Sequence, residues 1–441
     1  MPLDNGLNVS DANANYPSFG GPAFPLSFDY LGFHNSGLRQ REDCQVKHIM
    51  SSAVNSGNRP LAFWTKAYPP LYDIQNVIED LKQELIPSAI PRSPSDGDGR
   101  AKRLVIVGDV HGHLPELKVL LERINFGNTD GDHLIFVGDL INKGPDSAGV
   151  VQLAMNLGAS CVRGNNEDRV LLIYQACKVK LALEAASQKG MVSVDVKPSD
   201  ILASNCGIES DRVTAASLSR EQLEWLSSLP LVLNIGPLIG AQSPPWNSGS
   251  VVVVHAGLVP MLPLEKQDPW AMMNMRSLCY LSEGDQEEIR MALIKAARDR
   301  IRGRPPHWPK TDEDADAEIA RFRSSRNIGE HGSIPDNWLP VEGVMGRPWR
   351  DKWNRWQHSL PPSQRTTVIY GHDALAGLQV DAVGHVGDSL NGTRYAFGLD
   401  SGCVYGRQLT VLVIEADPER RDVRYRVVQV EHIARKVREF K

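Results

Sequence analysis

Short apolar runs that end in polar turns recur along the central and C-terminal parts of the chain. The runs are uninterrupted rather than alternating, and stretches with helical spacing of apolar residues, such as 114–126 and 147–158, lie between them. Strands that are apolar on both sides predict sheets covered on both faces, and alternation with helices predicts an α/β fold. The predicted strands lie at residues 103–109, 133–139, 159–165, 251–254, 366–372, 394–400 and 409–415.

The flanking segments follow other patterns. Residues 1–60 are rich in Asn, Ser, Gly and Pro, which is typical of a flexible N-terminal arm. Residues 61–100 are predicted to contain a helix over 73–86, capped by Asp73, and then a Pro- and Gly-rich linker. Residues 101–441 are predicted to form one domain with two insertions, one at about 181–216 without a strong period and one at about 283–341 with charged helices.

Composition narrows the class of protein without defining it. Of 441 residues, 41% are hydrophobic and 23% charged, which is typical of a globular protein with a sizeable core. The net charge of −5 offers no basic surplus, so we expect no sequence-specific nucleic-acid binding. Apolar runs are too short to span a membrane, the N-terminus does not resemble a secretory signal, and the six cysteines are scattered. These features predict a cytoplasmic protein without a membrane partner; a vacuolar location stays open if a targeting segment is missing.

Residue types that bind metals follow several of the predicted strands. One such turn would commonly be a helix cap, but five turns with oxygen or nitrogen donors are hard to explain in that way. Because strand ends converge at one edge of an α/β sheet, we expect these side chains to meet. They are Asp109 and His111 in GDVHG, Asp139 in GDLINKGP, Asn165 in RGNNED, His255 in VVVVHAGL and His372 in VIYGHDA.

The donor set fits two metal ions. A pair of ions about 3.5–4 Å apart needs one bridging carboxylate and separate terminal ligands. Asp109 and His111 can serve the first ion, Asp139 can bridge, and Asn165, His255 and His372 can complete the second. Mixed oxygen and nitrogen donors favour divalent transition metals, namely manganese, zinc, cobalt or iron, over calcium.

The motifs GDVHG, GDLINKGPDS, RGNNED, HAGL and YGHDA, in this order, resemble those of the calcineurin-like metallophosphoesterases, the superfamily of the Ser/Thr protein phosphatases. The stretch GLDSGCVYGRQLTVL resembles the C-terminal signature of bacterial diadenosine tetraphosphatase. KGPDS resembles the ApaH-like branch, which includes a fungal zinc-dependent endopolyphosphatase and a trypanosomal mRNA-decapping enzyme. The resemblance covers about residues 103–415 without the insertions, and implies a central β-sandwich flanked by helices with a dinuclear metal site at the strand ends.

The resemblance also implies a chemistry. A metal-bridging hydroxide would attack phosphorus in line, without a covalent enzyme intermediate. Lys143 takes the place of the phosphate-clamping arginine of the family, keeping its positive charge but losing its bidentate geometry. Arg163 and Arg276 are further clamp candidates, and for each of them a structural ion pair is the alternative.

Two positions depart from the family pattern. Asn166 stands where the family has the histidine that protonates the leaving oxygen, and Asn142 stands where protein phosphatases have the aspartate that orients this histidine. An amide cannot transfer a proton near neutral pH, and a general acid typically contributes 10²–10⁴-fold to the rate. Three explanations stay open: an engineered His→Asn change, a natural pseudoenzyme, and an enzyme whose leaving group needs no acid.

The sequence therefore predicts a metal-dependent phosphohydrolase that cleaves phosphoanhydride bonds in a polyanionic substrate, such as inorganic polyphosphate or a dinucleoside polyphosphate. Turnover is expected to be impaired by Asn166, because the general acid is missing. The alternatives are a Ser/Thr phosphoprotein phosphatase and a metal-binding pseudophosphatase. Catalytic roles are assigned to Asn142, Lys143, Arg163 and the position of Asn166, and substrate binding to Lys143, Arg163 and Arg276.

Overall fold

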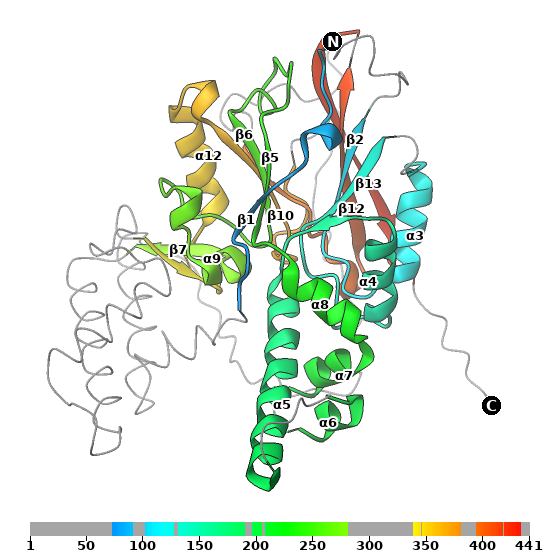
Figure 1. Ribbon diagram of the computed structural model, residues 1–441. Helices are drawn as coiled ribbons and strands as arrows, with labels where there is room; N and C mark the ends of the chain where they lie inside the picture. The colour runs from blue at the N-terminus through cyan, green and yellow to red at the C-terminus, as the bar shows by residue number, and fades with distance from the viewer. Residues whose placement is uncertain are drawn as a thin grey trace, which may run out of the picture.

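Two five-stranded sheets form the centre of the computed structural model, and a small three-stranded sheet lies beside them (Figure 1). The structure describes residues 73–90, 102–127, 131–189, 196–204, 208–280, 338–344, 346–380, 394–417 and 419–433. The N-terminal arm and most of the second insertion, with both of its predicted charged helices, lie outside these residues.

The first sheet has the strand order β13-β12-β2-β3-β4. Strands β2, β3 and β4 are parallel, whereas β12 is antiparallel to both β2 and β13. The carboxyl ends of β2, β3 and β4 therefore share one edge. The strands are β2 (Arg103–Val107), β3 (Asp132–Phe136), β4 (Ser160–Cys161), β12 (Gln408–Asp417) and β13 (Asp422–Glu431).

The second sheet has the order β1-β5-β6-β10-β11. Strands β6, β10 and β11 are parallel, β1 is parallel to β5, and β5 is antiparallel to β6. Its strands are β1 (Ile78–Asp80), β5 (Val232–Gly236), β6 (Ser250–Val254), β10 (Thr366–Tyr370) and β11 (Ala396–Gly398). The three-stranded sheet consists of β7 (Ser277–Tyr280), β8 (Trp338–Val341) and β9 (Arg347–Pro348).

Helices cover the outer faces of both large sheets. In Figure 1, α3 and α4 lie against the sheet of β12 and β13, α12 lies over the other sheet, and α5 projects away with α6 and α7 beside it. The α-helices are α3 (Leu114–Arg123), α4 (Ser147–Asn156), α5 (Asn165–Lys189), α6 (Pro198–Ala203), α7 (Glu209–Ser217), α8 (Arg220–Ser228), α9 (Pro269–Asn274) and α12 (Trp349–Ser359). Short 3-10 helices are η1 (Gln83–Leu85), η3 (Leu264–Lys266), η5 (Pro362–Gln364) and η6 (Cys403–Tyr405).

Three apolar clusters explain why the strands are apolar on both sides. Along β2, Leu104 and Ile106 face the cluster between the two sheets, whereas Val105 and Val107 face the cluster under α3 and α4. A third cluster, with Trp349 of α12, covers the outer face of the second sheet. Successive side chains of a strand point to opposite faces, so every position meets apolar surroundings. The predicted α/β fold, a β-sandwich flanked by helices, is confirmed.

The predicted helix over residues 73–86 is wrong. Residues Ile78–Asp80 form β1, which pairs with β5 in the register Ile78 to Val232, and a 3-10 helix follows. Val77 packs against the cluster under α12, whereas Leu81 and Ile86 enter the cluster between the sheets. The apolar residues therefore serve two cores rather than one helical face, and pairing with a distant strand overrides the local pattern.

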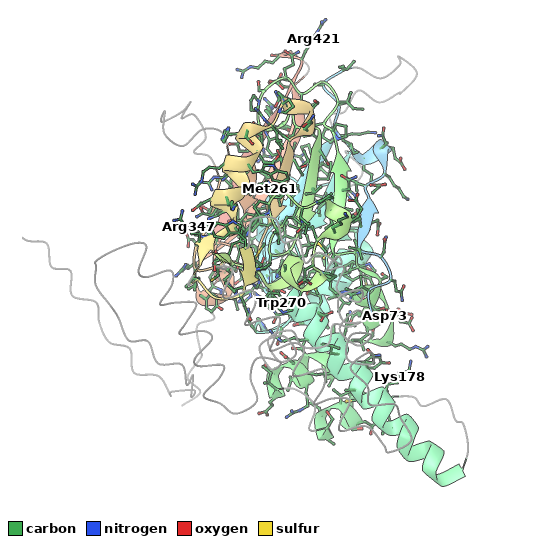
Figure 2. All side chains as sticks on the ribbon, turned by 90° about the vertical axis from the view of Figure 1, so that its left-hand side faces the viewer. Asp73, Lys178, Met261, Trp270, Arg347 and Arg421 are labelled. Carbon is green, nitrogen blue, oxygen red and sulfur yellow. The ribbon has the colours of Figure 1, made fainter. Side chains whose placement is uncertain are left out.

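The first insertion is helical where the structure describes it. Residues 181–216 contain the end of α5, all of α6 and most of α7. Figure 2 shows α5 running outward from the body of the molecule, with Lys178 on it and Arg421 at the opposite end. Among the described residues, no helix is long and apolar enough to cross a membrane.

Candidate metal centre

The carboxyl ends of the parallel strands in the two sheets meet at one place. Two hydrogen bonds bind the loops from different strands together there: Nδ1 of His255 lies 2.8 Å from the Val137 carbonyl oxygen, and the Gly371 N–H donates to the His255 carbonyl at 2.8 Å. The turns after β2, β3, β4, β6 and β10 converge at this point. All six residues predicted as metal ligands are in these turns.

Two groups of ligand atoms share Asp139. One group is Asp109, His111 and Asp139, the other is Asp139, His255 and His372, and within each group the ligand atoms lie within 4.8 Å of one another. Nε2 of His111 lies 3.5 Å from Oδ2 of Asp139, and Nε2 of His255 lies 3.4 Å from Oδ1. The two oxygens of one carboxylate therefore face two different histidines, which is the arrangement a bridging ligand requires.

Asn165 joins the second group. As placed, its side-chain oxygen lies 3.1 Å from Nε2 of His255, and the same atom position is 3.2 Å from both carboxylate oxygens of Asp139. The oxygen thus faces other acceptor atoms, which is unfavourable. Rotating the amide would remove this repulsion, because its NH₂ group would then donate to them. A cation among these lone pairs would relieve the conflict equally well without any rotation, because every atom facing it would then be a ligand.

The histidines present the lone pairs that a metal needs. Nδ1 of His111 lies 3.0 Å from the Ile141 carbonyl and Nε2 of His372 lies 3.0 Å from the Asn274 carbonyl. Each of these nitrogens must carry its hydrogen to donate, so the other nitrogen is an acceptor. His255 is arranged in the same way through Val137. Hydrogen bonding of one ring nitrogen to a backbone carbonyl is how metal-binding histidines are usually oriented.

Burial controls the charge of these groups. It lowers the pKa of His111 to about 4, and it lowers the pKa of His255 and His372 as well, so the imidazoles are neutral near pH 7. Burial, together with Asp400 and Asp139, raises the pKa of Asp109. For Asp139, burial opposes ionisation, but His255, His111 and Lys143 outweigh it and hold the pKa of this carboxyl below its usual range. Neutral imidazoles and the ionised carboxylate of Asp139 are the protonation states that bind metals, and a bound cation would favour the ionised form of Asp109 as well.

The backbone at the centre adopts conformations that ordinary residues avoid. His111, Asp139, Asn142, Lys143 and His372 have φ between 46° and 71°, in the left-handed region. Such backbone strain costs on the order of 1–3 kcal/mol per residue and is concentrated at functional sites. Two glycines let the backbone of these turns approach the acidic side chains closely. A Cβ at Gly164 would collide with the Asp139 carboxylate, and a Cβ at Gly371 would collide with the Asp109 carboxylate.

The residues present fit two divalent metals. Asp109 and His111 would hold one ion, Asn165, His255 and His372 would hold the other, and Asp139 would serve both. The fit rests on the converging lone pairs, the neutral imidazoles and the two buried acids, Asp109 and Asp139.

Asn166 is buried in a network of hydrogen bonds next to this centre. Its backbone N–H donates to Oδ1 of Asp139 at 3.0 Å, and its side-chain amide donates to Oδ2. Its oxygen accepts from Nδ2 of Asn142 at 3.1 Å and from the Arg169 guanidinium at 2.7 Å. The NH₂ group and the oxygen of the Asn166 amide are therefore both hydrogen-bonded, and Asn166 contacts Asn142 directly.

The three predicted clamp residues lie in different surroundings. Lys143 is exposed, and its Nζ lies 3.0 Å from Nε2 of His111. Arg276 donates to the His372 carbonyl at 3.1 Å, so its guanidinium borders the centre. Arg163 is fully buried, and its guanidinium donates to the Ser227 carbonyl and pairs with Asp168. The structure thus places Lys143 and Arg276 beside the centre, but not Arg163. Both arginines form ion pairs as in the structural alternative, Arg163 with Asp168 and Arg276 with Glu342 and Asp373.

Sequence reasoning gave no role to three acidic residues near the centre. Glu167 is completely buried and accepts hydrogen bonds from four backbone N–H groups, those of Asp139, Leu140, Ile141 and Gly164. Asp400 lies next to Asp109, and burial raises its pKa to about 6. Glu167 lies in the motif RGNNED and Asp400 in GLDSGCVYGRQLTVL. An acidic residue directly after a predicted strand was the sequence signal that could have identified them.

The third acidic residue, Asp211, lies in no sequence motif that could have identified it. Asp211 lies on α7, in the insertion that has no readable motif, yet its carboxylate accepts from Nδ2 of Asn142 and pairs with Arg169 at 3.0 Å. Thr214 of the same helix donates to Oδ1 of Asn142 at 3.1 Å. The insertion therefore contributes to the surroundings of Asn142 and Asn166.

The chain is similar to known phosphoesterases. The family model of the calcineurin-like phosphoesterases matches residues 102–401. The symmetrical bis(5'-nucleosyl)-tetraphosphatase of Nitrosospira multiformis is 26% identical over 332 residues, covering 70% of this chain and 91% of that protein. Its counterpart in Pectobacterium carotovorum is 28% identical over 323 residues, with 70% and 90% covered.

A crystal structure provisionally assigned as a diadenosine tetraphosphatase aligns with 81% of this chain and 99% of its own length, at 24% identity and a TM-score of 0.44. The family match spans more than half of the chain and includes Asp109, Asp139, Asn165, His255 and His372. The chain therefore belongs to the calcineurin-like phosphoesterase family and is distantly related to the symmetrical diadenosine tetraphosphatases.

Proposed function

We propose that the protein is a metal-dependent hydrolase of phosphoanhydrides, with inorganic polyphosphate or a dinucleoside polyphosphate as substrate. The metal pair would supply a hydroxide nucleophile at neutral pH and would neutralise charge on the phosphoryl oxygens. The chain's own residues would provide the ligand cage, a positively charged rim and the hydrogen bonds that orient the cage. The names of the bacterial relatives, which describe those proteins, support the anhydride class.

The observation that carries the proposal is the amide at position 166. Asn166 uses both ends of its side chain in hydrogen bonds to Asp139, Asn142 and Arg169, and none of these contacts supplies a group that donates a proton near pH 7. An alkoxide that leaves from a phosphomonoester is strongly basic and needs a proton. A phosphate that leaves from an anhydride is far less basic and can depart as an anion stabilised by metal or by cationic side chains.

Cationic side chains are available for such a leaving group. Lys143 is exposed beside His111, and Arg276 borders His372 with 23% of its side chain exposed. Arg350 adds a third cation, a second guanidinium, which is paired with Asp373 at 3.1 Å. Phosphate recognition by lysine and arginine is strong because the hydrogen bonds are charge-assisted.

The test compares substrates before and after Asn166→His. The protein, loaded with manganese, zinc or cobalt, is assayed on long-chain polyphosphate, diadenosine tetraphosphate, capped RNA and a phosphopeptide. We expect anhydride hydrolysis by the unaltered chain, and a gain on the phosphopeptide within the 10²–10⁴-fold range of a general acid, with a much smaller gain on anhydrides. Asn156→His, on the exposed end of α4, is the matched control.

The other outcomes point to other functions. Equal gains on phosphopeptide and anhydride would show that the leaving group does need a proton, and the proposal would fail. Preference of the unaltered chain for the phosphopeptide would make it a phosphoprotein phosphatase. Metal binding without hydrolysis of any substrate would identify a pseudophosphatase or a chain inactivated by Asn166.

A further inference from the structure

A second group of metal-binding side chains lies outside the candidate metal centre. His113 immediately precedes α3, Glu116 is in the first turn of α3, Cys403 begins η6, and His432 directly follows β13. One ligand atom from each of the four lies within 4.8 Å of the ligand atoms of the other three. Three segments that are far apart in the sequence therefore bring two imidazoles, a thiol and a carboxylate to one point.

The surroundings orient His113 as a ligand. Its Nδ1 lies 3.0 Å from the carbonyl oxygens of both Val110 and His111, so this nitrogen carries the hydrogen. Carbonyl oxygens only accept hydrogen bonds, so Nδ1 must be the donor. In the neutral ring Nε2 then carries no hydrogen, and its lone pair can bind a metal. This is the same orientation by backbone carbonyls that the histidines of the metal centre show.

His432 and Glu116 contribute atoms that face each other. Nδ1 of His432 is shielded from solvent, makes no hydrogen bond of good geometry to any described residue, and lies 3.2 Å from Oε1 of Glu116. The carboxylate of Glu116 is itself buried and accepts the Ile433 N–H at 3.0 Å. A buried nitrogen without a hydrogen bond normally requires an explanation, and an ion between it and the carboxylate provides one.

The size of the cluster suits a tetrahedral ion. Zinc binds imidazole nitrogen at about 2.0–2.1 Å and thiolate sulfur at about 2.3 Å, which places neighbouring ligand atoms about 3.3–3.8 Å apart. Atoms that already lie within 4.8 Å need to approach by about 1.5 Å at most. Burial raises the pKa of the Cys403 thiol to about 12, so a metal would have to displace its proton to bind the sulfur. Nitrogen with sulfur donors favours zinc.

We propose that His113, Glu116, Cys403 and His432 form a mononuclear zinc site, separate from the candidate metal centre and structural in role. Four protein ligands leave no open position for a substrate, which distinguishes structural from catalytic zinc sites. The ion joins the end of β13 to the turn that carries His111 and to the loop after Asp400. It thereby holds two loops of the metal centre in place from the C-terminal strand.

Cobalt(II) provides a direct test, because a thiolate bound to cobalt gives a charge-transfer absorption in the near ultraviolet. The ligand set assigned to the metal centre contains no cysteine, so this absorption would not come from that centre, and the cysteine variants identify its source. We expect the band in the cobalt-loaded full chain, its loss in Cys403→Ser, and its retention in the control Cys279→Ser, which alters another buried cysteine in β7. Zinc content measured by plasma mass spectrometry should fall by one ion per chain in Cys403→Ser.

His432→Gln provides the second variant, because His432 is partly exposed and its loss leaves the apolar core intact. We expect it to lower zinc content by up to one ion and to weaken the cobalt band. Absence of the band in the unaltered chain, or its persistence in Cys403→Ser, would overturn the proposal and identify the cluster as a hydrogen-bonded His432–Glu116 pair. These readouts do not depend on hydrolytic activity.

Discussion

At the scale of single residues, Asp139 is the group on which the candidate centre depends. Its carboxylate faces His111 on one oxygen and His255 on the other, and it also accepts both N–H donors of Asn166. The sequence indicated Asp139 as the shared ligand, and in the structure it follows β3, the middle one of three parallel strands. Its ligand role stays a prediction, which metal removal can test.

Stability in the presence of manganese should depend on Asp139. Metal that binds only the folded chain stabilises it by about 2.7 kcal/mol at a free concentration 100 times its Kd. We expect a chelator to lower the melting temperature and added manganese to restore it, as measured by calorimetry. Asp139→Asn should lose the manganese response, whereas the exposed control Asp351→Asn should keep it. An unchanged melting temperature on chelation would contradict the ligand assignment.

Lys143 is the cation best placed to contact substrate. Its Nζ is beside His111, and its side chain is exposed. Lys143→Gln removes one charge-assisted hydrogen bond, so kcat/KM for polyphosphate should fall by about 10- to 100-fold with little change in melting temperature. Lys143→Arg should recover part of the loss. The exposed control Lys118→Gln, on α3, should behave like the unaltered chain; an equal loss there would indicate a general charge effect.

At the scale of elements, the first turn of α5 supports the turn after β3. Glu167 accepts hydrogen bonds from Asp139, Leu140 and Ile141 in that turn, and from Gly164 just before α5. Its carboxylate thereby holds Asp139 in its left-handed conformation. Sequence motifs contain this residue, but only the tertiary contact between α5 and the turn shows that it positions Asp139.

Glu167→Gln should damage this support. A glutamine can accept through one oxygen only, so two backbone N–H groups would face an NH₂ donor, at a cost of about 1–3 kcal/mol for each unsatisfied group. We expect a lower free energy of unfolding in urea and a weaker affinity for manganese, measured by calorimetric titration. Glu122→Gln, exposed on α3, is the control. Unfolding at the same urea concentration with unchanged manganese affinity would show that the four N–H groups are satisfied in another way.

At the scale of the whole molecule, the first insertion contacts residues next to the candidate metal centre. Helix α7 places Asp211 and Thr214 on Asn142, and Asp211 also pairs with Arg169, which donates to Asn166. The insertion is thus connected through side chains to Asn166. Its sequence has no motif, and this connection exists only because α7 packs beside α5.

Asp211→Ala should therefore affect both stability and turnover. Asn142 and Arg169 would lose their buried acceptor, at a cost of about 1–3 kcal/mol in the free energy of unfolding. Displacement of Asn166 and Asp139 should lower kcat by about tenfold, since small misplacements of catalytic geometry are costly. The control Glu209→Ala alters an exposed acid on the same helix. A fall in stability with unchanged kcat would limit the role of α7 to folding.

The sequence by itself determined the fold class and identified the six turn residues that the structure brings together. It could do so because each lies in or directly after a local strand–turn pattern, and parallel strand ends must share an edge. Only the tertiary structure decided that residues 78–80 pair with β5, that Arg163 is buried on the Ser227 carbonyl, and that Asp211 reaches Asn142. Those outcomes depend on partners far away in the sequence, whose proximity no local pattern of apolar and polar residues encodes.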